Sequence, residues 1–245
     1  MAADPVVEQN RAAWNAQRYA AWVQADGPPA EEAARLVADP RRKLRRLLPH
    51  MSEVSGKRVL SVQGSNGRAA VAFALLGADV TVVDFAEENR RYALELAAAA
   101  GVAIDYRVAD AMEADRLGLA PFDWVTMELG ILHYHRDIGR FFAVMAALTR
   151  PGGGLVVNEF HPVERKLFQG PSRDYFDEGL IVGDVPNPVP GGPSLGQCAY
   201  RLWTLGEIVT AVIHAGFRLQ ALEETPGWMA EPTIPGLFTL VAERT

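Results

Sequence analysis

Apolar and polar positions alternate regularly in the middle of the chain. Short runs of branched aliphatic residues predict strands, and longer segments with apolar residues three and four apart predict helices. The strand-helix alternation favours a parallel, doubly wound sheet whose ligands bind at the carboxyl ends of the strands. The predicted strands are 58–62, 79–83, 103–108, 122–128 and 155–160, and the helices between them are 68–76, 87–100 and 138–149.

The first fifty residues have a helical pattern only. Helices are predicted over 10–24 and 30–37, separated by Gly27-Pro28-Pro29, and over 40–49, where Asp39-Pro40 forms the N-cap and first helical position. We expect residues 1–50 to form a helical lid.

The last third of the chain interrupts the alternation and then resumes it. Residues 161–203 are expected to be an insertion, because Asp184 to Gly196 alone carries four prolines and three glycines. A helix over 204–215, with Thr204 as N-cap and Glu207 three residues on, precedes strands over 217–223 and 237–243. The link 226–236 is expected to be a hairpin loop, so 51–245 would form one domain.

Composition narrows the class of protein. The 245 residues include 24 Lys and Arg against 30 Asp and Glu, a formal charge of −6, which does not suit a nucleic-acid partner. The single cysteine, Cys198, excludes an intrachain disulfide and a multi-cysteine zinc site. The start lacks a signal-peptide pattern, and the longest apolar stretch, 69–78, is too short to cross a bilayer. We expect a cytoplasmic protein, monomer or homodimer, with a small-molecule substrate and no metal, nucleic acid or membrane partner.

Three strand ends carry residues that suit a nucleotide-like ligand. The first predicted strand runs into Gly64-Ser65-Asn66-Gly67, whose glycines allow a tight turn and a close backbone approach. The second ends in Asp84, and an acid there can accept hydrogen bonds from ribose hydroxyls. The third is followed by Asp110. The spacing Gly64-x-x-Gly67 is not the complete glycine pattern of a dinucleotide-binding dehydrogenase.

In this order the segments resemble the class I S-adenosylmethionine-dependent methyltransferases, over about residues 57–161 and 204–243. The resemblance implies a Rossmann-like, mostly parallel seven-stranded sheet with an antiparallel C-terminal edge hairpin, and S-adenosylmethionine as cofactor. It implies that the glycine turn cradles the amino-acid part of the cofactor, Asp84 holds its ribose and Asp110 meets its adenine amino group. The cofactor-binding residues expected on this basis are Gly64, Ser65, Asn66, Gly67, Asp84, Phe85, Asp110, Ala111, Glu128 and Leu129.

The first motif departs from the family pattern. An acid and a third glycine are replaced by Ser61 and Gln63, so Glu128 or a carbonyl near Gly64 would have to hold the cofactor's ammonium group. Candidate catalytic residues are His133 and His161, which follow the fourth and fifth strands, and Tyr19 and Tyr175, whose rings could face a sulfonium. Glu128 and Glu159 form a second possible pair for an ammonium group.

Three functions are compatible with these residues. The favoured interpretation is methyl transfer to an oxygen or nitrogen of a small molecule. The alternative is ring closure of S-adenosylmethionine itself to azetidine-2-carboxylate, with release of methylthioadenosine, because some proteins of this shape do not methylate. A non-catalytic binding module is the third, and retention of both Asp84 and Asp110 argues against it.

Overall fold

The seven main strands form a mostly parallel sheet in the order β3-β2-β1-β4-β5-β9-β8, which confirms the expected Rossmann-like fold class. The computed structural model describes residues 5–227 and 233–245. The chain divides into two compact units. The first comprises Met1–Arg45, Glu53–Ala111 and Ile181–Ala199, and the second comprises Arg46–Ser52, Met112–Leu180 and Tyr200–Thr245.

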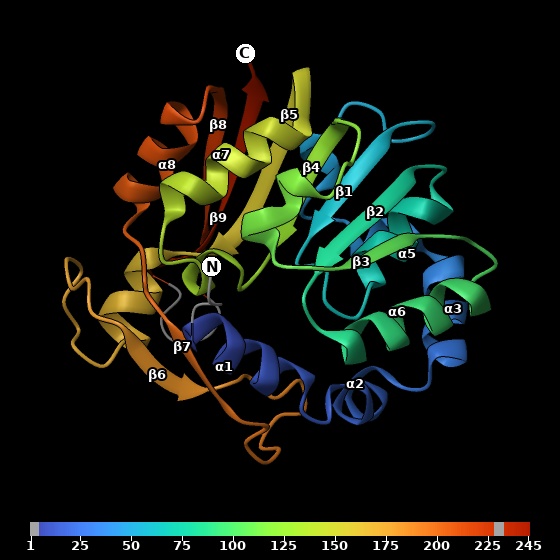
Figure 1. Cartoon of the computed structure of the whole chain (residues 1–245), viewed down its shortest axis with the longest axis horizontal. Helices are drawn as coiled ribbons and strands as arrows, with labels where there is room; N and C mark the ends of the chain where they lie inside the picture. Colours follow the sequence, from blue (N-terminus) through green and yellow to red (C-terminus); the bar gives the residue numbers. More distant parts are fainter. Residues whose placement is uncertain (1–4, 228–232) are drawn as a thin grey trace. The chain divides into compact units, whose positions relative to one another are not determined.

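The first unit contains three parallel strands with two helices between them (Figure 1). Strands β1 and β2 are buried along almost their whole length, as expected for central strands of a parallel sheet. The predicted strands and helices agree with the structure to within two residues at each end. The elements are β1 (Arg58–Val62), α5 (Arg68–Leu75), β2 (Asp79–Asp84), α6 (Glu87–Ala99) and β3 (Asp105–Val108).

The N-terminal helices pack against α5 and α6 within the first unit. The single helix expected over 10–24 is wrong, because it is broken into α1 (Pro5–Asn15) and α2 (Arg18–Asp26) at Gln17, which has a left-handed φ of 53°. Tertiary packing overrides the helical periodicity here: Arg18 is completely buried, and its guanidinium lies 4.1 Å from the Trp14 ring.

The next two helices follow the prediction in part. Helix α3 (Pro29–Ala38) agrees with it. The helix expected over 40–49 is correct at its start, where Asp39 caps α4, but α4 ends at Lys43 (Pro40–Lys43). Pro49 prevents a regular helix from continuing through residue 49, since proline lacks an N–H and its ring would meet the carbonyl of Arg45. A short 3-10 turn, η1 (Leu48–His50), follows instead.

The second unit contains the other four strands and two helices. Strand β4 pairs in parallel with β5, and β9 is antiparallel to both β5 and β8, so the expected closing hairpin is confirmed. Helices α7 and α8 contact each other, and α8 begins with the expected capping box between Thr204 and Glu207. Part of the expected loop, 228–232, lies outside the described residues. The elements are β4 (Phe122–Glu128), α7 (Ile138–Leu148), β5 (Thr149–Phe160), α8 (Leu205–His214), β8 (Phe217–Pro226) and β9 (Pro235–Arg244).

The segment expected to be an insertion contributes to both units. In the second it forms a π-helical turn, η4 (Glu164–Gln169). Strands β6 (Ile181–Asp184) and β7 (Gln197–Tyr200) form a separate two-stranded sheet. The side chain of Asn10 joins α1 to this sheet through both the N–H and the carbonyl of Ala199, at 2.7 and 2.9 Å. No helix among the described residues has the length and apolar character needed to cross a membrane.

Candidate functional site

The glycine turn after β1 has no room for side chains at its two glycines. A Cβ at Gly64 would lie 2.7 Å from the Ser61 hydroxyl and 2.9 Å from Val82. Gly67 has a φ of 77°, and a Cβ there would press against Ala93 of α6, whose Cα is only 3.1 Å away. Both glycines are therefore required by close packing, and the turn presents bare backbone at the point where α5 begins.

Asp84 lies at the end of β2 and is 6% exposed. One carboxylate oxygen accepts a hydrogen bond from the Ser65 N–H at 3.0 Å, and the other accepts one from the Ala86 N–H at 2.9 Å. Burial raises the pKa of Asp84, while these two N–H groups act in the opposite direction. The buried carboxylate therefore links the end of β2 directly to the glycine turn.

The end of β3 also contacts Asp84 and the glycine turn. The Ala109 N–H donates to the Asp84 carbonyl at 3.1 Å, which places half-buried Asp110 just beyond the paired strand ends. The Tyr106 hydroxyl donates to the Ser65 carbonyl at 2.8 Å. Ala111 and Phe85 are buried beside these strand ends. The first unit thus brings together the glycine turn, Asp84 and Asp110, as expected from the sequence.

An acid that sequence reasoning missed lies at the outer side of the turn. Asp26 of α2 accepts a hydrogen bond from the Asn66 side chain at 2.9 Å and forms an ion pair with Arg68 at 2.9 Å. Arg68 also contacts the buried carboxylate of Glu32 at 2.5 Å. Burial raises the pKa of Asp26, and the charge of Arg68 opposes that shift. Asp26 is forty residues away from the turn in the chain, so no local spacing signals this contact.

These residues fit S-adenosylmethionine. The cofactor's amino-acid part would need close approach to backbone, which the two glycines allow, and its ribose hydroxyls would donate to a strand-end carboxylate such as that of the buried Asp84. The absent acid in the first motif is not replaced within β1, where Ser61 is buried.

In the second unit, the turn after β4 is organised by a carboxylate from β5. Glu159 is 3% exposed and accepts four backbone hydrogen bonds, from Gly130, Ile131, Leu132 and Phe160. Its oxygens are therefore committed to the turn, which argues against the expected role of Glu159 in binding an ammonium group.

Glu128 and Leu129 lie where β4 ends. Glu128 is the last residue of the strand, opposite Asn158 of β5. Leu129 has a left-handed φ of 55° and donates its N–H to the Asn158 carbonyl at 2.8 Å. A leucine in this conformation is strained, and such strain is concentrated at functional turns.

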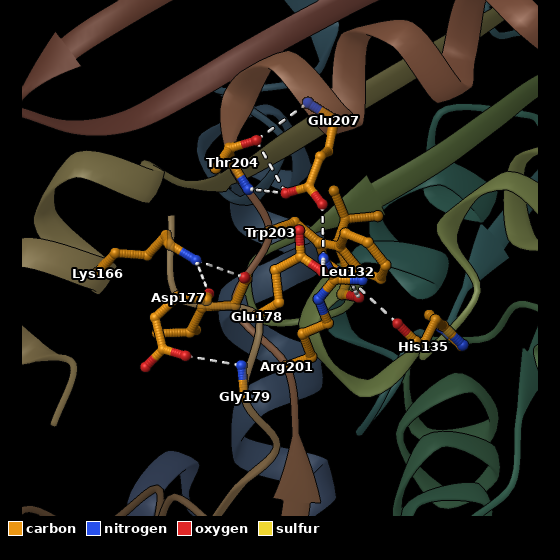
Figure 2. A network of polar contacts seen from close by, with 11 residues as sticks. Leu132, His135, Lys166, Asp177, Glu178, Gly179, Arg201, Trp203, Thr204 and Glu207 are labelled. Atoms are coloured by element: carbon orange, nitrogen blue, oxygen red, sulfur yellow. Dashed lines mark hydrogen bonds and ion pairs between the residues drawn. The ribbon is translucent and has the colours of Figure 1, made fainter. Parts of the chain in front are cut away.

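A small pocket with a cavity volume of about 30 Å³ lies beside this turn. Figure 2 shows how one of its walls is held: the Trp203 indole N–H donates to the carbonyls of Leu132 and His135, both at 3.1 Å. The Arg201 guanidinium lies 3.8 Å from the Trp203 ring and forms an ion pair with Glu207 at 2.6 Å. The lining residues are Leu132, His133, Glu159, Phe160, Pro162, Arg165, Leu202, Trp203, Ile208 and Phe238.

His133 is the candidate catalytic residue that lines this pocket. Its ring packs against Tyr134 and Tyr200, with centroids 4.2 and 5.4 Å apart. Burial, together with repulsion by Arg165, lowers the pKa of His133 to about 3, so the ring is neutral at physiological pH. Within the described part of the chain, neither of its ring nitrogens has a hydrogen-bond partner.

Each ring nitrogen of His161 lies close to a protein group. Nδ1 accepts a hydrogen bond from the Val163 N–H at 3.1 Å, so the proton of the neutral ring lies on Nε2. Nε2 is 2.8 Å from the Glu224 carboxylate. Burial lowers the pKa of His161, and Glu224 opposes that shift. A base role for His161 would require it to give up one of these contacts.

The two candidate tyrosines are also engaged. The Tyr19 hydroxyl donates to Glu95 of α6, and the Arg91 guanidinium lies 4.0 Å from its ring. The hydrogen bond to Glu95 and burial raise the pKa of Tyr19. The Tyr175 hydroxyl accepts a hydrogen bond from the Leu205 N–H, at the start of α8, at 3.0 Å. Both hydroxyls therefore hold helices in place in this structure.

Comparison with known proteins covers the middle of the chain by sequence and nearly all of it by fold. Residues 59–153 match the family model described as a methyltransferase domain. A ubiquinone biosynthesis O-methyltransferase from Caulobacter sp. (strain K31) is 35% identical over 102 residues, which is 42% of this chain and 40% of that protein. Its counterpart from Bordetella bronchiseptica is 34% identical over 100 residues, 41% of either chain. The chain therefore matches less than half the length of these curated relatives.

Two solved structures extend the fold comparison. An S-adenosylmethionine-dependent methyltransferase from Mesorhizobium loti has a TM-score of 0.62 and 23% identity, covering 85% of this chain and 100% of that one. A 1,6-didemethyltoxoflavin-N1-methyltransferase from Burkholderia thailandensis has a TM-score of 0.60 and 20% identity, covering 100% and 92%. The expected family resemblance is confirmed: residues 59–153 match the methyltransferase-domain family model, and the chain has the fold of the class I S-adenosylmethionine-dependent methyltransferases.

Proposed function

We propose that this protein transfers a methyl group from S-adenosylmethionine to an oxygen or nitrogen atom of a small molecule. The observation that carries the proposal is the first unit's combination of a bare glycine turn with a buried carboxylate, Asp84, at the next strand end. The methyltransferase-domain match over 59–153 includes both features. The curated relatives are O-methyltransferases, which favours methyl transfer over the ring-closure alternative.

The residues of the first unit have distinct roles in this proposal. Gly64 and Gly67, with Ser65 and Asn66 between them, let the backbone approach the amino-acid part of the cofactor. Asp84 would accept hydrogen bonds from the ribose hydroxyls, next to Phe85. Asp110 and Ala111 would meet the adenine. When bound, S-adenosylmethionine supplies an electrophilic methyl group on a positively charged sulfur.

The chain contributes mainly position and exclusion of water, because displacement at a sulfonium carbon needs no covalent enzyme intermediate. His133 is neutral and can accept a hydrogen bond from an acceptor hydroxyl or amine, orienting its lone pair. Tyr19, His161 and Tyr175 would act through position, since each already holds a protein partner.

Calorimetry with S-adenosylhomocysteine tests the cofactor assignment. We expect the unmodified protein to bind it and Asp84→Asn to bind it about 10–100-fold more weakly, because hydrogen bonds to a carboxylate are lost. The matched control is Asp105→Asn, an exposed acid of β3 that pairs with Arg107, and its affinity should not change. Equal affinity of the Asp84 and Asp105 variants would contradict the ribose assignment.

A second measurement separates the two reactions. Pure protein is incubated with S-adenosylmethionine alone, and the products are separated by chromatography. Methyl transfer predicts a cofactor that is stable until an acceptor is added. Rapid formation of methylthioadenosine and a cyclic amino acid without any acceptor would refute methyl transfer in favour of ring closure.

A further inference from the structure

The glycine turn of the first unit packs on a row of side chains that crosses three strands. Strands β1, β2 and β3 are neighbours in the sheet (Figure 1), and in their parallel registers Ser61 lies beside Val82, which lies beside Tyr106. Register partners on adjacent strands point to the same face of a sheet. A Cβ at Gly64 would lie 2.7 Å from the Ser61 hydroxyl and 2.9 Å from Val82, so the turn folds back onto this row. Tyr106 is therefore placed to reach the turn from two strands away.

Tyr106 contacts the turn through its hydroxyl. The residue is 6% exposed, and the hydroxyl donates to the Ser65 carbonyl at 2.8 Å. Burial raises the pKa of Tyr106 well above its ordinary value, and the negative charges of Asp84 and Glu87 add to this shift. The hydroxyl therefore keeps its proton at neutral pH and remains a hydrogen-bond donor.

Ser65 has a backbone conformation that its own side chain does not favour. Its φ is 50°, in the left-handed region that glycine enters far more readily than serine. Two hydrogen bonds hold the peptide groups on either side of the Ser65 Cα: its N–H donates to the Asp84 carboxylate at 3.0 Å, and its carbonyl accepts from Tyr106. Because one contact precedes the Cα and the other follows it, together they restrain both backbone angles of Ser65.

We propose that Tyr106 is a positioning residue of the cofactor site, which holds Ser65 in the conformation that receives the amino-acid part of S-adenosylmethionine. The inference rests on the proposed function and adds a residue from the middle of β3, which no strand-end spacing singles out. The hydroxyl acts through the Ser65 carbonyl and does not have to touch the cofactor. Without it, only Asp84 would hold the Ser65 peptide groups, and the serine would relax toward conformations with negative φ. The affinity for the cofactor would fall with the fraction of molecules whose turn is still correctly formed.

Calorimetry with S-adenosylhomocysteine measures this effect in Tyr106→Phe, which keeps the ring and removes the hydroxyl. We expect the affinity to fall about 3–10-fold, the effect of one neutral hydrogen bond. The matched control is Thr149→Val at the start of β5. It removes another buried hydroxyl that donates to a backbone carbonyl, that of Met145, at 2.7 Å. The affinity of this control should not change.

A substitution at position 65 distinguishes positioning from a general loss of stability. Glycine adopts positive and negative φ about equally readily, so Ser65→Gly makes the left-handed conformation accessible without help from Tyr106. In the Ser65→Gly background, Tyr106→Phe should therefore change the affinity by less than about twofold. If the Tyr106 hydroxyl only stabilised the fold, its removal would cost the same affinity with serine and with glycine at position 65.

Hydrogen exchange tests the contact without any cofactor. The Ser65 N–H donates to Asp84, so a turn that loosens at Ser65 exposes this amide to solvent more often. In the ligand-free protein, Tyr106→Phe should lower the protection of the Ser65 amide about 3–10-fold, and Thr149→Val should leave it unchanged. Urea midpoints of the variants show whether each is folded.

The outcomes separate this inference from the proposed function. Unchanged affinity or unchanged Ser65 protection in Tyr106→Phe would overturn the inference. An equal loss of affinity in Thr149→Val, or the same loss with glycine at position 65, would overturn it as well. Any of these results with normal S-adenosylhomocysteine binding by the unmodified protein leaves the proposed function intact. Failure of the unmodified protein to bind S-adenosylhomocysteine would contradict the proposed function, and with it the role of Tyr106 in cofactor binding, while Ser65 exchange would still show whether Tyr106 holds the turn.

Discussion

Gly67→Ala tests whether the glycine turn is fixed by packing. Two penalties are expected: the left-handed φ of 77°, and the collision of the new Cβ with Ala93 of α6. Gly101 separates them, because its φ of 71° is similar while nothing lies within 4 Å of its notional Cβ. Both variants should therefore lose about 1–2 kcal/mol from the left-handed backbone. Overpacking should cost Gly67→Ala about 1–3 kcal/mol more.

Urea unfolding followed by circular dichroism measures this difference. With a slope of about 2–3 kcal/mol per molar urea, the midpoint of Gly67→Ala should lie about 0.3–1.5 M below that of Gly101→Ala. Calorimetry should also show weaker S-adenosylhomocysteine binding for Gly67→Ala only, because α5 and the turn must shift away from α6. Equal midpoints for the two variants would refute the argument that contact with Ala93 requires glycine at this position.

Three further changes test other parts of the structure. The pKa of His133 is about 6.5 in the unfolded chain, whereas burial keeps it at about 3 in the folded protein. The free energy of unfolding should therefore decrease as the pH is lowered from about 6.5 to 3, by up to about 1.4 kcal/mol per pH unit. The decrease should be less steep in His133→Gln. Urea midpoints at pH 7 and 5 that change equally in both proteins would contradict this. Thr204→Ala should lower the free energy of unfolding by about 1–2 kcal/mol through loss of the capping box, whereas Thr210→Ala, an exposed change within α8, should not. Glu159→Gln should lower the free energy of unfolding by about 2–3 kcal/mol, because an NH₂ group would face backbone N–H donors. An unchanged Tm in thermal unfolding would show that the four hydrogen bonds are dispensable.

The strands and the helices between them could be predicted from the sequence because local signals agree with the tertiary fold there. The start of β5 is the exception: it was predicted at residue 155 and lies at Thr149. Strand β1 was predicted to the residue, since its aliphatic Val59, Leu60 and Val62 stand between the charged Lys57-Arg58 pair and the glycine turn. The α8 N-terminus was predictable because the capping box lies within four residues.

The failures occurred where distant contacts decide the structure. Gln17 carries no breaker signal, yet the chain turns there and buries Arg18 against Trp14. In the candidate site, Asp84 and the glycine turn could be predicted from spacing. Asp26 could not, because it reaches the turn from another helix, and Arg165 could not, because only the fold places it beside a pocket.

The contact of Arg68 with both Asp26 and Glu32 has a consequence for exchanging parts between relatives. Arg68 opens α5, directly behind the glycine turn, and its two partners come from α2 and α3. The curated relatives align with only about 100 residues of this chain. A chimera that joined this core to the N-terminal helices of another methyltransferase would leave a half-buried arginine beside the turn without its two acids. The N-terminal helices and the turn therefore have to be exchanged together. A functional chimera that contains Arg68 must also contain Asp26 and Glu32.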